Sequence, residues 1–243
     1  MSGVQRPAEG QEGQGGLEGR DGGAGRLYAQ LLGAVGRRFD HIASRQATHM
    51  RCAAGCHACC APGLSVSLVE ARALAAHLEA HPEVAREALA LEASDPHGGG
   101  RCSLLNARGE CVVYEARPLV CRTHGAPLLI PVEALEPRGQ GLSEGAGEEG
   151  GGEPPLALTA CELNFTEAGA LEGLGEGEWL DVRQLDQALA LLSARASQAG
   201  VGQVAGARWP LRASALLGEG GPLTAPERQP PQGINDQQRR EER

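Results

Sequence analysis

The chain has 243 residues, which is enough for one domain with tails or for two small domains. Its 22 basic residues, all arginine, are outnumbered by 31 acidic residues, so the net charge is −9, and aromatic residues make up only 2% of the chain. Surfaces that bind nucleic acid need a basic face and aromatic stacking platforms, so we expect no nucleic-acid partner. No run of 18 or more apolar residues occurs, so we also expect no membrane partner.

The N-terminal segment lacks the apolar stretch and the small-residue cleavage site of a secretory signal. We therefore expect a cytoplasmic location, where cellular reductants keep thiols reduced. Clustered cysteines in such a chain favour metal binding over disulfide bonds.

Three segments have a composition typical of disorder, because they hold few large apolar side chains. Residues 1–25 contain nine glycines, residues 136–155 carry five acidic side chains against one arginine, and residues 213–243 are rich in proline, glutamine and charge. We predict two disordered tails and one acidic disordered insertion, the latter within a metal-binding domain that spans residues 26–212.

Apolar side chains predict a helix near the start of this domain, because five of them recur at steps of three and four and so share one face. These five are Tyr28, Leu32, Val35, Phe39 and Ile42. Further along, Ser67 and Glu70 have the spacing of a capping box, which predicts a helix running towards His81. Pro82 suits a first helical position and predicts a helix over residues 82–93.

Near the end of the domain, Asp181 is placed to cap a helix whose apolar residues share one side. These residues are Val182, Leu185, Leu189 and Leu192. Short apolar runs at residues 112–114, 128–132 and 156–159 predict strands. The expected fold is therefore mainly α with short β-hairpin pieces, in a small cysteine-rich, metal-centred domain.

The first cysteine cluster has the form C-x3-C-x2-C-C and comprises Cys52, Cys56, Cys59 and Cys60. A two-residue gap lets a tight turn direct two sulfur atoms at one ion, and thiolates select zinc or iron–sulfur clusters over hard cations. Adjacent side chains tend to point apart, so Cys59 and Cys60 either serve two centres or include one packed thiol.

The remaining candidate metal ligands are Cys102, Cys111, Cys121 and Cys161. Residues 106–109 predict a turn that folds Cys102 back beside Cys111, and Pro118 bends the chain so that Cys121 can return. Eight cysteines suit two four-thiolate sites, or one site with reserve thiols.

Two further stretches accompany the cysteine quartet in order. They are Cys111-Val-Val-Tyr114-x2-Arg117-Pro118-x2-Cys121-Arg122-x-His124-Gly125 and Cys161-x2-Asn164-Phe165. Together the three stretches resemble the YkgJ-type cysteine-cluster family, also known as the zinc- or iron-chelating domain family. The resemblance covers about half of the chain, from Met50 to Phe165, and implies zinc or iron bound through the cysteines, with the metal left open.

Several neighbours of the cysteines are candidates for supporting roles. Arg51, Arg101 and Arg122 each adjoin a cysteine in the sequence and are expected to lower thiol pKa values. His124 lies three positions after Cys121 and is a secondary candidate ligand, with a place on the surface or behind the ligands as the alternative.

Other polar residues near the cysteines fit structural roles. His57 is expected to point outward, and Arg117 to shape its loop or neutralise the cluster. Tyr114 is expected to pack beside the centre with its hydroxyl satisfied, and Asn164 to cap a turn after Cys161.

The sequence thus favours a metal-binding module that serves interaction, storage or delivery. The alternative is an iron–sulfur redox or S-adenosylmethionine-dependent enzyme, including methyl transfer, because Cys52-x3-Cys56-x2-Cys59 has the spacing found in radical enzymes. Such enzymes build a β/α barrel after the motif, and this chain shows neither the alternation nor the length. No hydrolytic triad or phosphate loop is evident, so enzymatic activity stays an open question and protein partners stay unknown.

Overall fold

The computed structural model describes residues 23–53, 55–95, 100–135, 155–198, 208–218 and 222. Its helices are α1 (Ala24–Arg45), α2 (Leu68–Ala80), α3 (Pro82–Ser94), α4 (Leu119–Thr123), α5 (Val182–Gln198) and α6 (Ala213–Leu217), with 3-10 turns η1 (Tyr114–Ala116) and η2 (Val132–Leu135). The strands are β1 (Ser65–Val66), β2 (Leu128–Pro131), β3 (Leu156–Thr159), β4 (Leu180–Asp181) and β5 (Trp209–Pro210). The mainly helical fold is confirmed. Most of the predicted tails and insertion lies outside the described residues.

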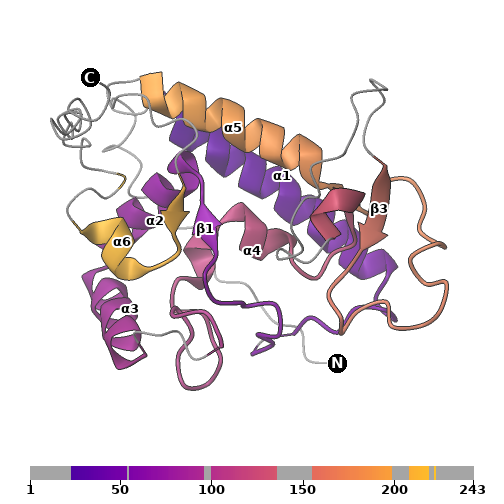
Figure 1. Cartoon of the computed structure of the whole chain (residues 1–243), viewed down its shortest axis with the longest axis horizontal. Coiled ribbons are helices and arrows are strands. Elements are labelled where there is room, and N and C mark those ends of the chain that lie inside the picture. The colour runs from indigo at the N-terminus through magenta and orange to yellow at the C-terminus, as the bar shows by residue number, and fades with distance from the viewer. Residues whose placement is uncertain are drawn as a thin grey trace, which may run out of the picture.

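Helices α1 and α5 lie side by side along one side of the molecule (Figure 1). The predicted helical face of α1 is confirmed, since Tyr28, Val35 and Ile42 are buried and the other two members pack against them. With Leu189 and Ala196 of α5, these side chains form the first hydrophobic core.

Helix α2 lies between two hydrophobic cores. Leu68 and Val69 belong to the first core, whereas Leu74 and Leu78 belong to a second core that also receives Leu216 of α6. A helix that is apolar nearly all round is buried on most sides, and α2 fits this rule. The helices that complete the second core, α3 and α6, lie on the opposite side of α2 from α1 and α5 (Figure 1).

The predicted capping box at the start of α2 is confirmed, and it has a second function. The Glu70 carboxylate accepts hydrogen bonds from the Ser67 backbone N–H (2.9 Å) and the Ser67 hydroxyl (2.8 Å). Its other oxygen accepts the Leu119 backbone N–H (3.0 Å) at the first residue of α4. Glu70 is only 2% exposed, so this carboxylate fixes α4 against α2 from inside the molecule.

The strands form two small sheets. Strand β2 pairs antiparallel with β3 and parallel with β4, and β1 pairs antiparallel with β5. The predicted strands at 128–132 and 156–159 are confirmed as β2 and β3. The predicted strand at 112–114 is wrong. Cys111 makes an isolated β-bridge to Leu105, and the chain then turns into η1 instead of continuing as a strand.

Regular structure continues past residue 212, the predicted end of the folded domain. Helix α6 packs Ala213 and Leu216 into the second core. None of the described helices is both long and apolar enough to cross a membrane.

Candidate metal centre

The loop of residues 51–61 carries four cysteines on two consecutive tight turns. The Cys56 N–H donates to the Ala53 carbonyl (3.0 Å), and the Cys60 N–H donates to the His57 carbonyl (2.9 Å). Cys52 and Cys56 are exposed, whereas Cys59 and Cys60 are half-buried. The second turn therefore brings the adjacent pair towards the body of the domain.

The predicted turn between Cys102 and Cys111 is confirmed. The Asn106 backbone N–H donates to the Glu110 carbonyl (2.9 Å), and the Asn106 side-chain oxygen accepts the Arg108 (2.9 Å) and Glu110 (3.0 Å) backbone N–H groups. This hairpin is tied to the first loop, because the Cys102 N–H donates to the Cys60 carbonyl (2.9 Å).

Helix α4 delivers a further cysteine to the same place. Pro118 is its N-cap residue and Cys121 lies in its first turn, so Glu70 and Pro118 together set the position of this sulfur. Cys102, Cys111 and Cys121 all pack against the second core.

Four half-buried sulfur atoms therefore share one neighbourhood, which we call the inner group: Cys60, Cys102, Cys111 and Cys121. The pKa of Cys60 is lowered by Cys59, and negative charge on Cys102, Cys111 or Cys121 partly opposes this lowering; burial raises the pKa of Cys121, and charge on Cys102 or Cys111 raises it further. Three chain segments that are distant in sequence meet at this point.

A second neighbourhood, the outer group, comprises Cys52, Cys56 and Cys161. Charge on Cys56 or Cys161 raises the pKa of Cys52. Asn164 lies between the segments, with its side-chain N–H 3.3 Å from the Cys52 sulfur and its backbone N–H donating to the Cys161 carbonyl (2.8 Å).

Cys59 connects the two groups. The adjacent thiols act on each other, which raises the pKa of Cys59 and lowers that of Cys60. Cys59 also interacts electrostatically with Cys52 of the outer group and Cys121 of the inner group. The adjacent pair of cysteines therefore adjoins both groups.

The expectation that neighbouring arginines lower the thiol pKa values is wrong for most of these cysteines. Burial raises the pKa of Cys102 and Cys111, and raises that of Cys121 to about 12. For Cys59, Cys111 and Cys121 the cation that opposes the raised pKa is Arg117, which is not adjacent to a cysteine in the sequence.

Two of the three arginines adjacent to cysteines donate hydrogen bonds to backbone carbonyls. Arg51 donates to the Thr48 carbonyl (2.6 Å), and Arg122 donates to the Arg117 carbonyl (2.8 Å). Arg122 thereby supports the loop that carries Arg117, whose guanidinium carbon lies 3.6 Å from the centroid of the Tyr114 ring. Tyr114 is 55% exposed, so the prediction that it packs beside the centre is wrong.

The two histidines are placed differently. The Nδ1 atom of His124 hydrogen-bonds to the Val120 carbonyl of α4. Nε2 is therefore the ring nitrogen that is left to bind a metal ion. His57 is exposed, with Nδ1 3.1 Å from the Gly55 carbonyl, and its ring packs over Gly109 of the hairpin turn.

The donor chemistry of both groups fits zinc or iron, because thiols without disulfide partners are the ligands that these metals take in four-thiolate sites. Within the described residues, no three His, Cys, Asp or Glu side chains stand in a ready metal-binding arrangement. The sulfurs thus share neighbourhoods rather than coordination positions.

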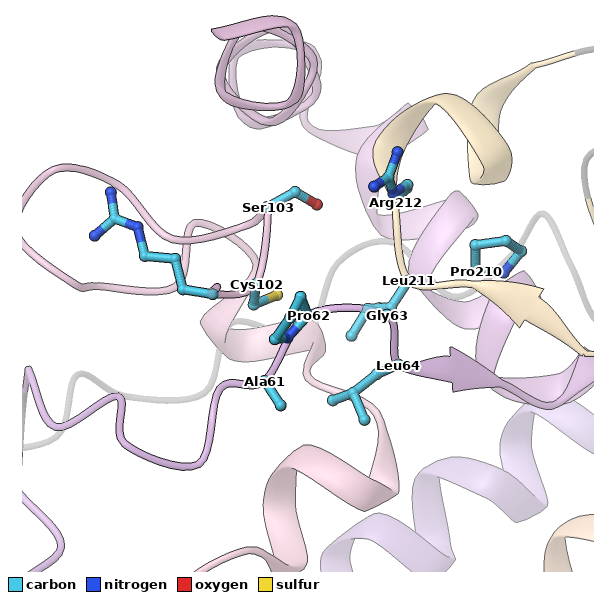
Figure 2. A pocket seen from close by; sticks show the side chains of 10 residues that line it. Ala61, Pro62, Gly63, Leu64, Cys102, Ser103, Pro210, Leu211 and Arg212 are labelled. Carbon is cyan, nitrogen blue, oxygen red and sulfur yellow. The ribbon is translucent and has the colours of Figure 1, made fainter. Parts of the chain in front are cut away.

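A small hollow adjoins the inner group. Its volume is about 30 Å³, and it lies between residues 61–64, the start of the hairpin and residues 210–212. Figure 2 shows the Cys102 sulfur directed towards Pro62 at its edge. This space suits a water molecule.

Part of the chain is similar to a known protein family. Residues 51–136, about a third of its length, match the model of the CxxCxxCC family, described as a putative zinc- or iron-chelating domain. The matched range holds seven of the eight cysteines, and Cys161 lies beyond it. Neither the curated proteins nor the solved structures contain a match to this chain.

Proposed function

We propose that this protein, whose residues 51–136 match the model of the CxxCxxCC zinc- or iron-chelating family, binds zinc or iron through its eight cysteines and acts as a metal-binding module in the cytoplasm. The observation that carries the proposal is the inner group. Its sulfurs come from the first cysteine loop, the hairpin and α4, and three of the four pack against the same hydrophobic core.

The cysteines divide between two sites in this proposal. The inner group supplies four thiolates, and the outer group supplies three, to which Cys59 adds a fourth. A bound divalent ion would link loops that have little regular structure of their own, since most of residues 51–61 and 100–112 lie outside helices and strands. Structural zinc adds its binding free energy directly to folding.

Arg117 supports metal binding electrostatically. Four thiolates around a divalent ion carry a net charge of −2, and Arg117 is the guanidinium that acts on Cys59, Cys111 and Cys121. A nearby cation favours the charged form of a thiol, which is the form that binds metal.

A second candidate function is an iron–sulfur redox or S-adenosylmethionine-dependent enzyme. The exposure of Cys52 and Cys56 favours it, because a cluster held there would be open to a small ligand. The described strands, however, form two small sheets rather than a β/α barrel. We therefore rank the binding module first.

Anaerobic purification followed by metal and labile-sulfide analysis tests the proposal. We expect stoichiometric zinc in a colourless protein, or iron without labile sulfide. Iron with labile sulfide and a brown colour would favour the second candidate, and a metal-free protein that also fails to take up added zinc or iron would contradict both.

Two variants then test the assignment of the cysteines to groups. Cys121→Ser should remove the metal of the inner group, and Cys56→Ser that of the outer group, each leaving the other metal in place. Each variant is the matched control of the other, and circular dichroism checks that both remain folded. Full metal content in both variants would contradict the proposed sites.

A further inference from the structure

The Asn164 side chain lies at the junction of three chain segments. Its Oδ1 accepts the Arg51 backbone N–H (2.7 Å), and its Nδ2 donates to the Gly125 carbonyl (2.7 Å) and towards the Cys52 sulfur (3.3 Å). The residue is only 4% exposed. Both hydrogens of the amide and its oxygen are therefore used, which fixes the orientation of the group.

The backbone next to Asn164 is held as firmly as its side chain. Phe165 has a φ of 52°, in the left-handed region that L residues rarely adopt, and such a conformation persists only where contacts determine it. Here the Phe165 N–H donates to the His49 carbonyl (2.9 Å), and the two rings stack with centroids 5.6 Å apart. Residues 164 and 165 therefore hydrogen-bond to the backbone on both sides of Met50, Asn164 to Arg51 and Phe165 to His49.

Gly125 provides the space for the Cys52 sulfur. A Cβ atom at this position would lie 2.5 Å from that sulfur, and the φ of +98° also favours glycine. The sulfur therefore rests against the Gly125 backbone, whose carbonyl accepts the other hydrogen bond from Asn164.

We propose that Asn164 is the positioning residue for Cys52: it holds the sulfur for metal binding by an N–H···S contact and joins residues 161–165 to the first cysteine loop. This inference rests on the proposed function, because it concerns a ligand of the outer group. Asn164 acts through Cys52 and does not itself bind the metal. Hydrogen bonds to ligand sulfurs orient them and tune the metal that they hold.

The same contacts explain how Cys161 joins the outer group although it lies after residues 136–154. Asn164 donates its backbone N–H to Cys161 and its side-chain N–H towards Cys52, so one residue sets the relative position of two ligands. An aspartate at this position would keep the acceptor for Arg51 but lose both donors, and its charge would repel a thiolate.

The test loads the full chain with cadmium-113 and follows each site by NMR, because each thiolate site gives its own signal. Cys52→Ser identifies the outer signal and Cys111→Ser the inner one. We expect Asn164→Asp to shift or abolish only the outer signal and to lower the cadmium affinity of that site by about 10–100-fold. Gln30→Glu makes the same amide-to-carboxylate change at an exposed position of α1, outside the cysteine loops, and should leave both signals unchanged.

A double-mutant cycle separates positioning from general destabilisation. If Asn164 acts through Cys52, adding Asn164→Asp to Cys52→Ser should not lower the remaining cadmium affinity further. An outer signal and affinity unchanged by Asn164→Asp would overturn the inference alone, and so would a further loss in the double variant. A wild-type chain without any Cys52-dependent signal would contradict the proposed function as well.

Discussion

The inner and outer cysteine groups are positioned in different ways. The inner group is built on regular structure: a hairpin, the first turn of α4 and the wall of the second core hold three of its four sulfurs. The outer group includes the exposed Cys52 and Cys56, and Asn164 donates a side-chain hydrogen bond towards the Cys52 sulfur. Hydrophobic packing therefore positions most of the inner sulfurs, whereas a single buried amide contacts the outer group at Cys52.

This difference implies unequal dependence on metal. Without an ion, the inner sulfurs keep their packing against the second core, whereas Cys52 and Cys56 keep only two turns and one hydrogen-bonded neighbour. We therefore expect the inner group to be largely preformed and the outer group to be ordered by the metal itself.

Metal removal should have the largest effect. Structural zinc contributes on the order of 10 kcal/mol in small zinc-dependent peptides, so chelation should strongly lower the free energy of unfolding. Hydrogen exchange should show complete loss of amide protection in residues 52–60 and partial loss in residues 102–121. The amides of α1 and α5 should keep their protection. Adding zinc back is the control and should restore protection. Equal loss in both segments would remove the distinction between the groups.

Glu70→Ala should have the next largest effect, and it acts on the inner group. The change leaves the Ser67 and Leu119 N–H groups without their buried acceptor, which should cost about 2–6 kcal/mol at about 1–3 kcal/mol for each orphaned donor. Urea unfolding measures the loss, and the inner cadmium signal should shift because α4 carries Cys121. Glu79→Ala changes an exposed residue of the same helix and should stay within about 0.5 kcal/mol.

Gly125→Ala should have a smaller effect on stability and act on the outer group. The left-handed backbone costs a non-glycine residue roughly 1–2 kcal/mol, and the new methyl group also displaces the Cys52 sulfur. We expect the outer metal to be lost and the inner metal to remain, by metal analysis. Gly169→Ala carries a similar strain at a φ of +79° with open space around it, and should keep both metals. Metal loss in both variants would assign the effect to strain rather than to the clash.

The smallest effect concerns acid stability away from both groups. The Gly175 N–H, the Arg45 side chain and Gln46 hold the pKa of Glu178 below its usual value. This stabilisation is present above the unfolded pKa of about 4.3 and is lost as the pH falls through the lower folded pKa. The loss of Tm caused by Glu178→Gln should therefore be largest at about pH 6 and should shrink as the pH falls through the lowered folded pKa.

Metal-free protein should be used for this comparison, because protons displace metal from thiolates at low pH. Glu176→Gln, at an exposed neighbouring position, is the control and should show no such pH-dependent difference. A Glu178→Gln effect that does not shrink as the pH falls would contradict the role of its carboxylate.

The helices were predictable because their signals are local. Ser67 and Glu70 lie three residues apart, Pro82 begins α3, and the apolar residues of α1 repeat at helical spacing, so each element follows from a short stretch of sequence. The turn at 106–109 was predictable for the same reason, since Asn106 caps it through its own side chain.

The contacts between distant segments were not predictable. Nothing in the sequence near Glu70 indicates that it accepts the Leu119 N–H, and Asn164 was predicted only as a cap after Cys161. Arg117 was expected to shape its loop or neutralise the cluster, but its action on Cys59 of the distant first loop depends on the fold, and two of the arginines adjacent to cysteines, Arg51 and Arg122, donate to backbone carbonyls instead. The eight ligand candidates could be identified by residue type, but their division into groups depends on the fold.

One consequence concerns the adjacent cysteines. Neighbouring Cα atoms are 3.8 Å apart, so two metal centres that take Cys59 and Cys60 as ligands must lie close together. Each centre with four thiolates would carry a charge of −2, and like charges at short range repel. Loading the first centre should therefore weaken the affinity of the second, and added salt should reduce this negative cooperativity.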